Sequence, residues 1–288
     1  MTGILGGLVG SAVGASAIAT GGVVTTSGAY TYHRFSSGGT FQVVNGVGKT
    51  FEVLAIGKSG SRGTNTTSSA TAGGGPGAGD VASSSFQLAN GQYTVTIATI
   101  FGGSSNFGGL LTAGGGGNGG RSTAAATSGA GGGGGGAGSA TTSLRTGAAG
   151  NTNSNAFGFN GGNGSPRFDL NDDGAVQYSV GGGGGGAGSA GSNGTGSSGS
   201  NATGGRGGDG TSAFSEWGFA TNTGEPNNGL RWYAGGGGGN AVFQEDTLGR
   251  VVVTPGAAGF GAFAPGGGGS APGSSLTPNG LVIIRYLT

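Results

Sequence analysis

Hydrophobic and polar residues alternate in short runs near the beginning of the chain. Residues 31–35 (TYHRF) and 40–44 (TFQVV) alternate, and residues 51–56 (FEVLAI) form a compact apolar run. Gly38-Gly39 and Asn45-Gly46 separate these runs, and such pairs are typical of hairpin turns. The pattern therefore predicts short β-strands joined by tight turns.

Two further runs extend this prediction. Residues 92–100 (QYTVTIATI) alternate after the Asn90-Gly91 pair, and the last nine residues (GLVIIRYLT) are rich in β-branched side chains. We predict a small β-sheet that contains residues 28–58, 92–100 and 281–287. The final strand is expected to return to the first ones and to tie the two ends of the chain together.

The pattern changes between about residues 102 and 280. Runs of glycine stand at 114–117, 131–136, 181–186, 235–239 and 266–269, with a shorter one at 73–75, and the decapeptide GGGGGGAGSA occurs at both 131–140 and 181–190. No part of this region has the 3.6-residue apolar period of an amphipathic helix, so almost no α-helix is expected.

The composition excludes several classes of protein. Glycine accounts for 80 of the 288 residues, and only 7% are charged. Collagen is excluded because no Gly-X-Y register is sustained and only seven residues are proline. Ordinary disorder fits poorly, since disordered chains are usually rich in charge, whereas this one has 14 Phe, 6 Tyr and 2 Trp.

Glycine runs have two plausible structures. They can be flexible linkers, or they can adopt the polyproline II conformation as polyglycine II helices, with three residues per turn and outward-pointing N–H and C=O groups. Ordering glycine costs about 1–2 kcal/mol per residue, and each backbone hydrogen bond returns about 0.5–1.5 kcal/mol. Order therefore requires many runs packed side by side with nearly every group paired. Six runs of similar length favour such a bundle.

The predicted fold is thus mainly β and irregular, with almost no α-helix. We expect an apolar N-terminal docking segment (1–27), a small β subdomain (28–101) completed by strand 281–287, and a glycine-rich polyglycine II domain with loops (102–280). Residues 1–20 could also be interpreted as a signal peptide or a membrane span. They lack the basic n-region of the former and the flanking anchors of the latter, so a segment facing an assembly partner is favoured and no membrane span is expected.

Charge and reactive residues give few signs of chemistry. The formal net charge is +1 and there is no cysteine, so neither nucleic-acid binding nor thiol metal sites are predicted. His33 is the only histidine and lies in an alternating run, which indicates a strand residue. No nucleophile, acid–base pair or phosphate loop stands out, and the chain is not predicted to be an enzyme.

One motif resembles the first half of a calcium-binding loop. Asp169, Asn171 and Asp173 alternate before Gly174, but position twelve is Val180 rather than a bidentate carboxylate. The alternative is a turn rich in Asp and Asn. Calcium is therefore a weak candidate, and no other cofactor is expected.

Aromatic residues concentrate between the glycine runs. They could form small cores that cap the ends of the glycine rods, or an exposed contact surface, because Trp and Tyr supply large rigid area. The candidate receptor-binding residues are Phe157, Phe159, Tyr178, Trp217, Arg231, Trp232 and Tyr233.

The order of these features carries a family resemblance. YTYHRFSSGGTFQV is followed by FEVLAIG, GQYTVTI, repeated glycine runs and a closing GLVIIRY. This order resembles the glycine-rich tail-fibre and adhesin proteins of tailed bacteriophages. The resemblance implies a small β region before a sandwich of polyglycine II helices, whose loops contact a host receptor.

Three functions remain open. The favoured one is a virion fibre or tail-tip protein that docks to other virion proteins through residues 1–27 and binds a bacterial surface receptor, either a glycan or an outer-membrane protein. The second is a purely structural virion component, such as a head fibre or tail connector. The third is a secreted glycine-rich structural protein.

Overall fold

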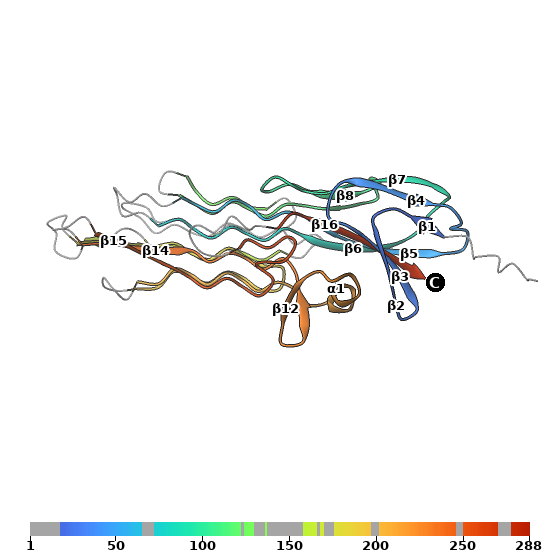
Figure 1. Cartoon of the computed structure of the whole chain (residues 1–288). Coiled ribbons are helices and arrows are strands. Elements are labelled where there is room, and N and C mark those ends of the chain that lie inside the picture. The colour runs from blue at the N-terminus through green and yellow to red at the C-terminus, as the bar shows by residue number, and fades with distance from the viewer. Residues whose placement is uncertain are drawn as a thin grey trace, which may run out of the picture.

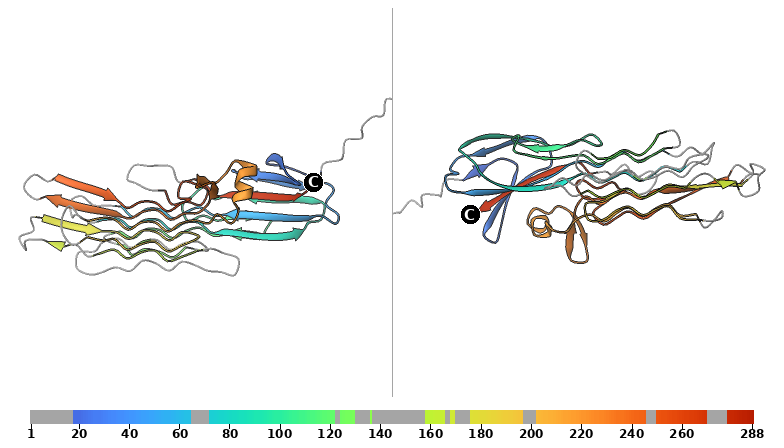
Figure 2. Two further views of the ribbon diagram at one scale, coloured as in Figure 1. Left: turned by 90° about the horizontal axis from the view of Figure 1, so that it is seen from below. Right: turned by 180° about the vertical axis from the view of Figure 1, so that it is seen from behind.

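The structure is a computed structural model that describes most of the chain. The described residues are 18–64, 72–121, 124–129, 136, 158–165, 168–169, 176–196, 202–245, 250–269 and 278–288. The molecule is elongated, with a β region at the end that holds the C-terminus (Figure 1). From there, undulating extended segments run side by side to the opposite end in all three views (Figures 1 and 2).

Two five-stranded antiparallel sheets form the β region. The first has the order β1 (Ala19–Thr20), β4 (Gly39–Val43), β7 (Gly91–Thr96), β8 (Ser105–Phe107), β9 (Leu111–Ala113). The second has the order β2 (Val23–Ser27), β3 (Tyr30–Phe35), β16 (Leu281–Leu287), β5 (Thr50–Ile56), β6 (Val81–Gln87). β16 pairs with both β3 and β5, which confirms that the final strand returns to the first ones.

Three details of the sequence-based organisation are wrong. The predicted strands do not share one sheet, because β4 and β7 lie in a different sheet from β3, β5 and β16. Residues 19–27 form β1 and β2 instead of belonging to a separate docking segment, and residues 1–17 lie outside the described part. The β region also continues past residue 101 through β8 and β9. A half-apolar sheet must cover its hydrophobic face, and here a second sheet does so.

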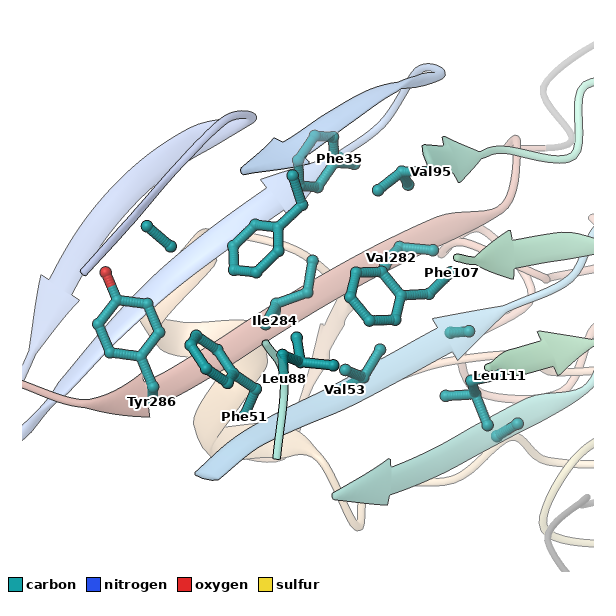
Figure 3. Packing of buried hydrophobic residues seen from close by; sticks show 14 of the residues in the cluster. Phe35, Phe51, Val53, Leu88, Val95, Phe107, Leu111, Val282, Ile284 and Tyr286 are labelled. Carbon is teal, nitrogen blue, oxygen red and sulfur yellow. The ribbon is translucent and has the colours of Figure 1, made fainter. Parts of the chain in front are cut away.

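The core of the β region lies between the two sheets (Figure 3). Phe41 is fully buried, with its ring edge-on to Phe51 and Phe107 at centroid distances of 5.8 and 5.9 Å. Alternation along β16 sends Val282, Ile284 and Tyr286 into this core. Leu281 and Ile283 face the other side, where they pack against a second cluster that contains Trp217 and Tyr233.

His33 lies in β3, as predicted, and is fully buried. Its Nδ1 lies 2.7 Å from the carbonyl oxygen of Gly21 and its Nε2 lies 3.2 Å from the hydroxyl of Tyr286. Because a carbonyl oxygen only accepts hydrogen bonds, Nδ1 carries the proton. Nε2 can then accept a hydrogen bond from the Tyr286 hydroxyl. Burial lowers the pKa of His33, and the ring joins the β1–β2 turn to the sheet.

The glycine-rich segments beyond the β region pair through their backbones with a spacing of three residues. Every third N–H group of residues 57–63 donates to a carbonyl of the antiparallel segment 74–80: Gly57 to Asp80 at 2.9 Å, and Gly60 to Gly77 and Gly63 to Gly74 at 3.0 Å. Segment 74–80 in turn donates to 114–120 with the same spacing: Gly74 to Gly120, Gly77 to Gly117 and Asp80 to Gly114.

The run 181–186 lies at the centre of this network. Along residues 180–187, successive backbone groups point to different neighbours, and each neighbour is contacted again three residues later. The segment donates to 234–240 and 189–192, and it accepts from 75–78, 159–165 and 205–208. Five neighbouring segments therefore surround one extended glycine run, a pattern that differs from the two neighbours of a β-strand.

Close approach explains why these positions are glycine. A Cβ atom built on Gly183 would overlap the carbonyl oxygen of Arg206, and one on Gly184 would overlap that of Pro76. None of the six glycines of 181–186 has a positive φ, so the absence of a side chain matters here rather than an unusual backbone angle. Of the other run, 131–136, only Gly136 is described, and it donates to Gly75 at 2.8 Å and accepts from Gly120 at 2.9 Å.

A four-stranded sheet, which the sequence pattern did not predict, lies at the end remote from the C-terminus (Figure 1). Its order is β10 (Phe168–Asp169), β11 (Val176–Val180), β14 (Asn240–Glu245), β15 (Arg250–Pro255). β11 leads directly into the run 181–186, and β14 directly follows the run 235–239. Strand pairing therefore continues where the glycine runs end.

Candidate contact surface

Residues 211–234 fold into a short helix and a hairpin on one side of the molecule, near the junction of the β region with the glycine segments (Figure 2). The helix is α1 (Ser215–Thr221), the only one among the described residues. This confirms a mainly β fold with almost no α-helix. Asn222 ends α1 in the left-handed conformation, with φ at 50° and its N–H bonded to the carbonyl of Gly218.

The hairpin consists of β12 (Glu225–Asn227) and β13 (Leu230–Trp232). Asn228 and Gly229 connect the strands with φ values of 49° and 73°, as a type I′ turn requires. The hairpin is fixed to α1 by a hydrogen bond of 2.8 Å from the backbone N–H of Arg231 to the Ser215 hydroxyl. It is thus held against the helix rather than projecting freely.

Three of the seven predicted contact residues are buried. Trp217 is 5% exposed, Tyr178 is 3% exposed and Tyr233 has no exposed surface. Burial raises the pKa of Tyr233 to about 12, and its hydroxyl lies 2.7 Å from that of Thr223. For these three residues the alternative of small capping cores holds, and the prediction of an exposed contact surface does not.

The other four predicted contact residues differ in their exposure to solvent or lie outside the described residues. Trp232 and Arg231 are half-buried in β13, and Phe159 is exposed. Phe157 lies outside the described residues. The structure brings Trp217, Arg231 and Tyr233 together around α1. The Trp232 ring packs against Phe260 instead, and Tyr178 belongs to a separate cluster in the remote sheet.

Further exposed apolar residues, Leu230, Phe260 and Phe263, lie on the hairpin and on the segment beside it. The Trp232 ring packs against Phe260 at 5.5 Å. The backbone N–H of Phe263 donates to the carboxylate of Glu225 at 3.0 Å, and Glu225 is the strand partner of Trp232. We call Leu230, Trp232, Phe260 and Phe263 the hairpin patch. Phe263 is 49% exposed, and its place in the aromatic stretch GFGAF between two glycine runs was the available sequence signal.

Charged groups border the hairpin patch. The Arg206 guanidinium lies 5.4 Å from the centre of the Phe260 ring and is paired with Asp209. On the opposite side of β13, Arg231 lies 5.3 Å from the ring of Phe219, which is 56% exposed. Aromatic rings beside arginines are typical of protein contact surfaces.

The calcium motif is only partly described. Asp169 lies in β10 opposite Gln177, whereas Asn171 and Asp173 fall outside the described residues. Within the described ranges, no three His, Cys, Asp or Glu side chains are grouped so that they could hold a metal ion. In the same part of the chain, no helix has the length and apolar character needed to cross a membrane.

Comparison with known proteins adds no further assignment. No known family model matches the chain, and no curated protein is significantly similar to it in sequence.

Proposed function

We propose that the glycine-rich segments form a bundle of packed polyglycine II helices. The observation that carries this proposal is the three-residue alternation of hydrogen-bond partners along 180–187 and 57–63. A helix with three residues per turn and no internal hydrogen bonds directs its backbone groups outward with that repeat. Pro76 fits such a helix because it lacks an N–H group, and its carbonyl accepts from Gly237 at 3.0 Å.

Amide hydrogen exchange tests the bundle directly. The N–H groups of Gly181, Gly184 and Ala187 all donate to the segment 234–240, so they should exchange as slowly as those of β16 in the β core. The N–H of Gly48, an exposed residue in a turn, provides the fast-exchanging control. Rapid exchange throughout 181–187 would show that these glycines are not held in a bundle.

We further propose that the chain is a phage virion fibre or tail-tip protein that attaches the particle to a bacterial surface receptor. Its location would then be the surface of the virion, and its partners would be other virion proteins and the receptor. The resemblance in sequence order, the elongated shape and the hairpin patch support this function. A bundle fixed by backbone bonds holds such a patch in a constant position, which lowers the entropic cost of binding.

Adsorption measurements test the attachment role. Phe263→Ala and Trp232→Ala in the particle should slow adsorption to host cells, because exposed aromatic side chains often dominate contact energies. Phe101→Ala is a matched control, since Phe101 is 51% exposed but lies in the β region. Normal adsorption of both patch variants would show that the hairpin patch does not contact the receptor.

A second candidate function is that of a purely structural virion component. It is favoured by β2, an edge strand whose five residues VVTTS are all exposed and uncharged. Such edges readily pair with another chain. Particles that assemble only with the chain, yet adsorb normally with every patch variant, would support this role. Absence of the chain from purified particles would overturn both virion roles and leave a secreted structural protein.

A further inference from the structure

A row of polar side chains crosses the outer face of the second sheet. Tyr32 of β3, Arg285 of β16, Glu52 of β5 and Ser85 of β6 are successive cross-strand partners. The Arg285 guanidinium donates from Nε and Nη2 to Oε2 of Glu52 at 3.0 and 2.8 Å. This row lies on the same face as the apolar contacts with α1.

The helix α1 fixes Arg285 from the other side. Its Nη1 lies 3.3 Å from Oε1 of Glu216, and the guanidinium lies between the rings of Tyr30 and Trp217 at 4.2 and 4.5 Å. The side chain is only 13% exposed. Arg285 is therefore held in place, with its charge balanced by two carboxylates.

A groove of about 430 Å³ opens beside this cluster, between α1 and the edge strand β6. We call it the α1 groove, and its lining includes Glu52, Ser83, Ser85, Phe214, Glu216 and Arg285. Its size falls in the range of about 300–1,000 Å³ that is usual for small-molecule sites.

The α1 groove offers hydrogen-bonding groups that the described part of the chain does not use. Each carboxylate engages Arg285 through one oxygen only, which leaves Oε1 of Glu52 and Oε2 of Glu216 available. The hydroxyls of Ser83 and Ser85 bond to no other described residue. Carboxylate oxygens only accept hydrogen bonds, whereas serine hydroxyls also donate. A ligand that matches this set carries several hydroxyl groups close together.

The charge of the groove narrows the ligand class further. The two carboxylates of Glu52 and Glu216 outweigh the single positive charge of Arg285. An acidic ligand would therefore meet net negative charge in the groove. The half-buried ring of Phe214 adds an apolar wall on which the C–H face of a sugar ring can rest.

We propose that the α1 groove binds a neutral saccharide unit, a hexose or an N-acetylhexosamine. The inference deepens the proposed function, on which it rests for its biological setting, by assigning a glycan as one receptor contact. The groove is separate from the hairpin patch, since α1 lines the groove and supplies none of the patch residues. Sugar recognition would thus be placed on rigid elements at the junction of the two regions.

Titration of the full chain with defined sugars tests this directly. Lactose and N,N′-diacetylchitobiose serve as neutral probes and 3′-sialyllactose as the acidic one, with binding followed by NMR shifts of the Trp217 indole and by calorimetry. We expect saturable binding of at least one neutral probe and at least tenfold weaker binding of the acidic one. No saturation by either neutral probe at millimolar concentration, or a preference for sialyllactose, overturns the proposal.

Variants place the binding in the α1 groove. Glu216 is 69% exposed at its side chain, so Glu216→Gln should fold normally and weaken binding about tenfold through loss of a charged acceptor. Ser85→Trp should fill the groove and abolish binding, while Ser37→Trp, at another exposed serine, should have no effect. Unchanged binding by folded Ser85→Trp would place the sugar elsewhere and overturn the assignment.

The failure of this inference can be distinguished from failure of the attachment role. Normal adsorption of Ser85→Trp particles, together with slow adsorption of Phe263→Ala particles, would support the attachment role. It would contradict the saccharide site as a receptor contact. If the isolated chain binds a neutral sugar but is absent from particles, saccharide binding by the α1 groove is supported and the virion role is contradicted.

Discussion

The β region and the glycine-rich segments differ in the side-chain property on which their packing depends. In the β region, large side chains such as Phe41, Phe51 and Phe107 fill the space between two sheets. The glycine-rich segments lie so close together that a single Cβ on Gly184 would overlap a neighbouring carbonyl. The packing of one region depends on large side chains and that of the other on the absence of side chains. A larger residue should therefore destabilise the glycine-rich segments, whereas a smaller one should destabilise the β region.

The largest effect is expected from adding one methyl group between the closely packed glycine-rich segments. Gly184→Ala should lower the free energy of unfolding by about 4–5 kcal/mol, the exceptional range for single substitutions, because the added atom meets backbone rather than a movable side chain. Guanidinium titration followed by fluorescence measures the change.

Gly38→Ala is the matched control for this substitution. Gly38 is exposed, and a Cβ there would meet only the carbonyl oxygen of Val95, at 3.5 Å. Its effect should stay within about 0.5 kcal/mol. Equal effects of the two alanines would contradict the close-packed bundle.

Removing side-chain volume from the β core should have the next largest effect. Phe51 is fully buried and packs edge-on against Phe41 and Tyr286, so Phe51→Ala should cost about 3–5 kcal/mol. The same titration measures the change. Phe101→Ala, at an exposed position, should cost less than about 0.5 kcal/mol, and a similar loss for both would argue against the two-sheet core.

A smaller effect is expected at alkaline pH where α1 and the hairpin meet the glycine segments. Because burial raises the pKa of Tyr233 from 10 to about 12, the folded state disfavours the phenolate. The protonated Tyr233 hydroxyl contributes about 2–3 kcal/mol to the free energy of unfolding. This contribution is complete below pH 10 and is lost as pH rises to about 12. Unfolding of the wild type and of Tyr233→Phe between pH 9 and 12 measures this loss. Parallel pH profiles would contradict the assignment.

The smallest effect is expected from the one histidine of the β region. Burial lowers the pKa of His33 below its usual value of 6.5, so the unfolded chain takes up a proton first as pH falls. Stability should therefore decrease below about pH 6.5. The hydrogen bond to Gly21 remains possible in the protonated form, which limits the loss. His33→Gln should flatten the profile between pH 7 and 5, and an unchanged slope would show that His33 does not contribute.

The sequence was most informative where the period of the pattern is short and local. Alternation in TYHRF and FEVLAI predicted strands at β3 and β5, and the β-branched closing residues predicted a strand that pairs with them. The absence of a helical period correctly indicated almost no α-helix. The distribution of these strands over two sheets was not predictable, since either face of an alternating strand can meet a second layer.

The candidate site was less predictable than the strands. Aromatic composition directed attention to residues 211–234, but Trp217 and Tyr233 are buried while Phe219 and Phe263 are exposed. The same residue types serve as core and as surface, so composition does not distinguish them. The α1 groove was not foreseen, because Glu52, Glu216 and Arg285 are distant in sequence.

The sequence by itself determined the local conformations, because alternation favours strands and long glycine runs leave the backbone free of side chains. Only the tertiary structure decided which segments became neighbours, which aromatic rings were buried and which charges met around Arg285. The reason is that these contacts join residues far apart along the chain, such as Glu52 and Arg285 or Gly75 and Gly182. Such contacts depend on how all segments pack at once, whereas a local pattern reports only on its own residues.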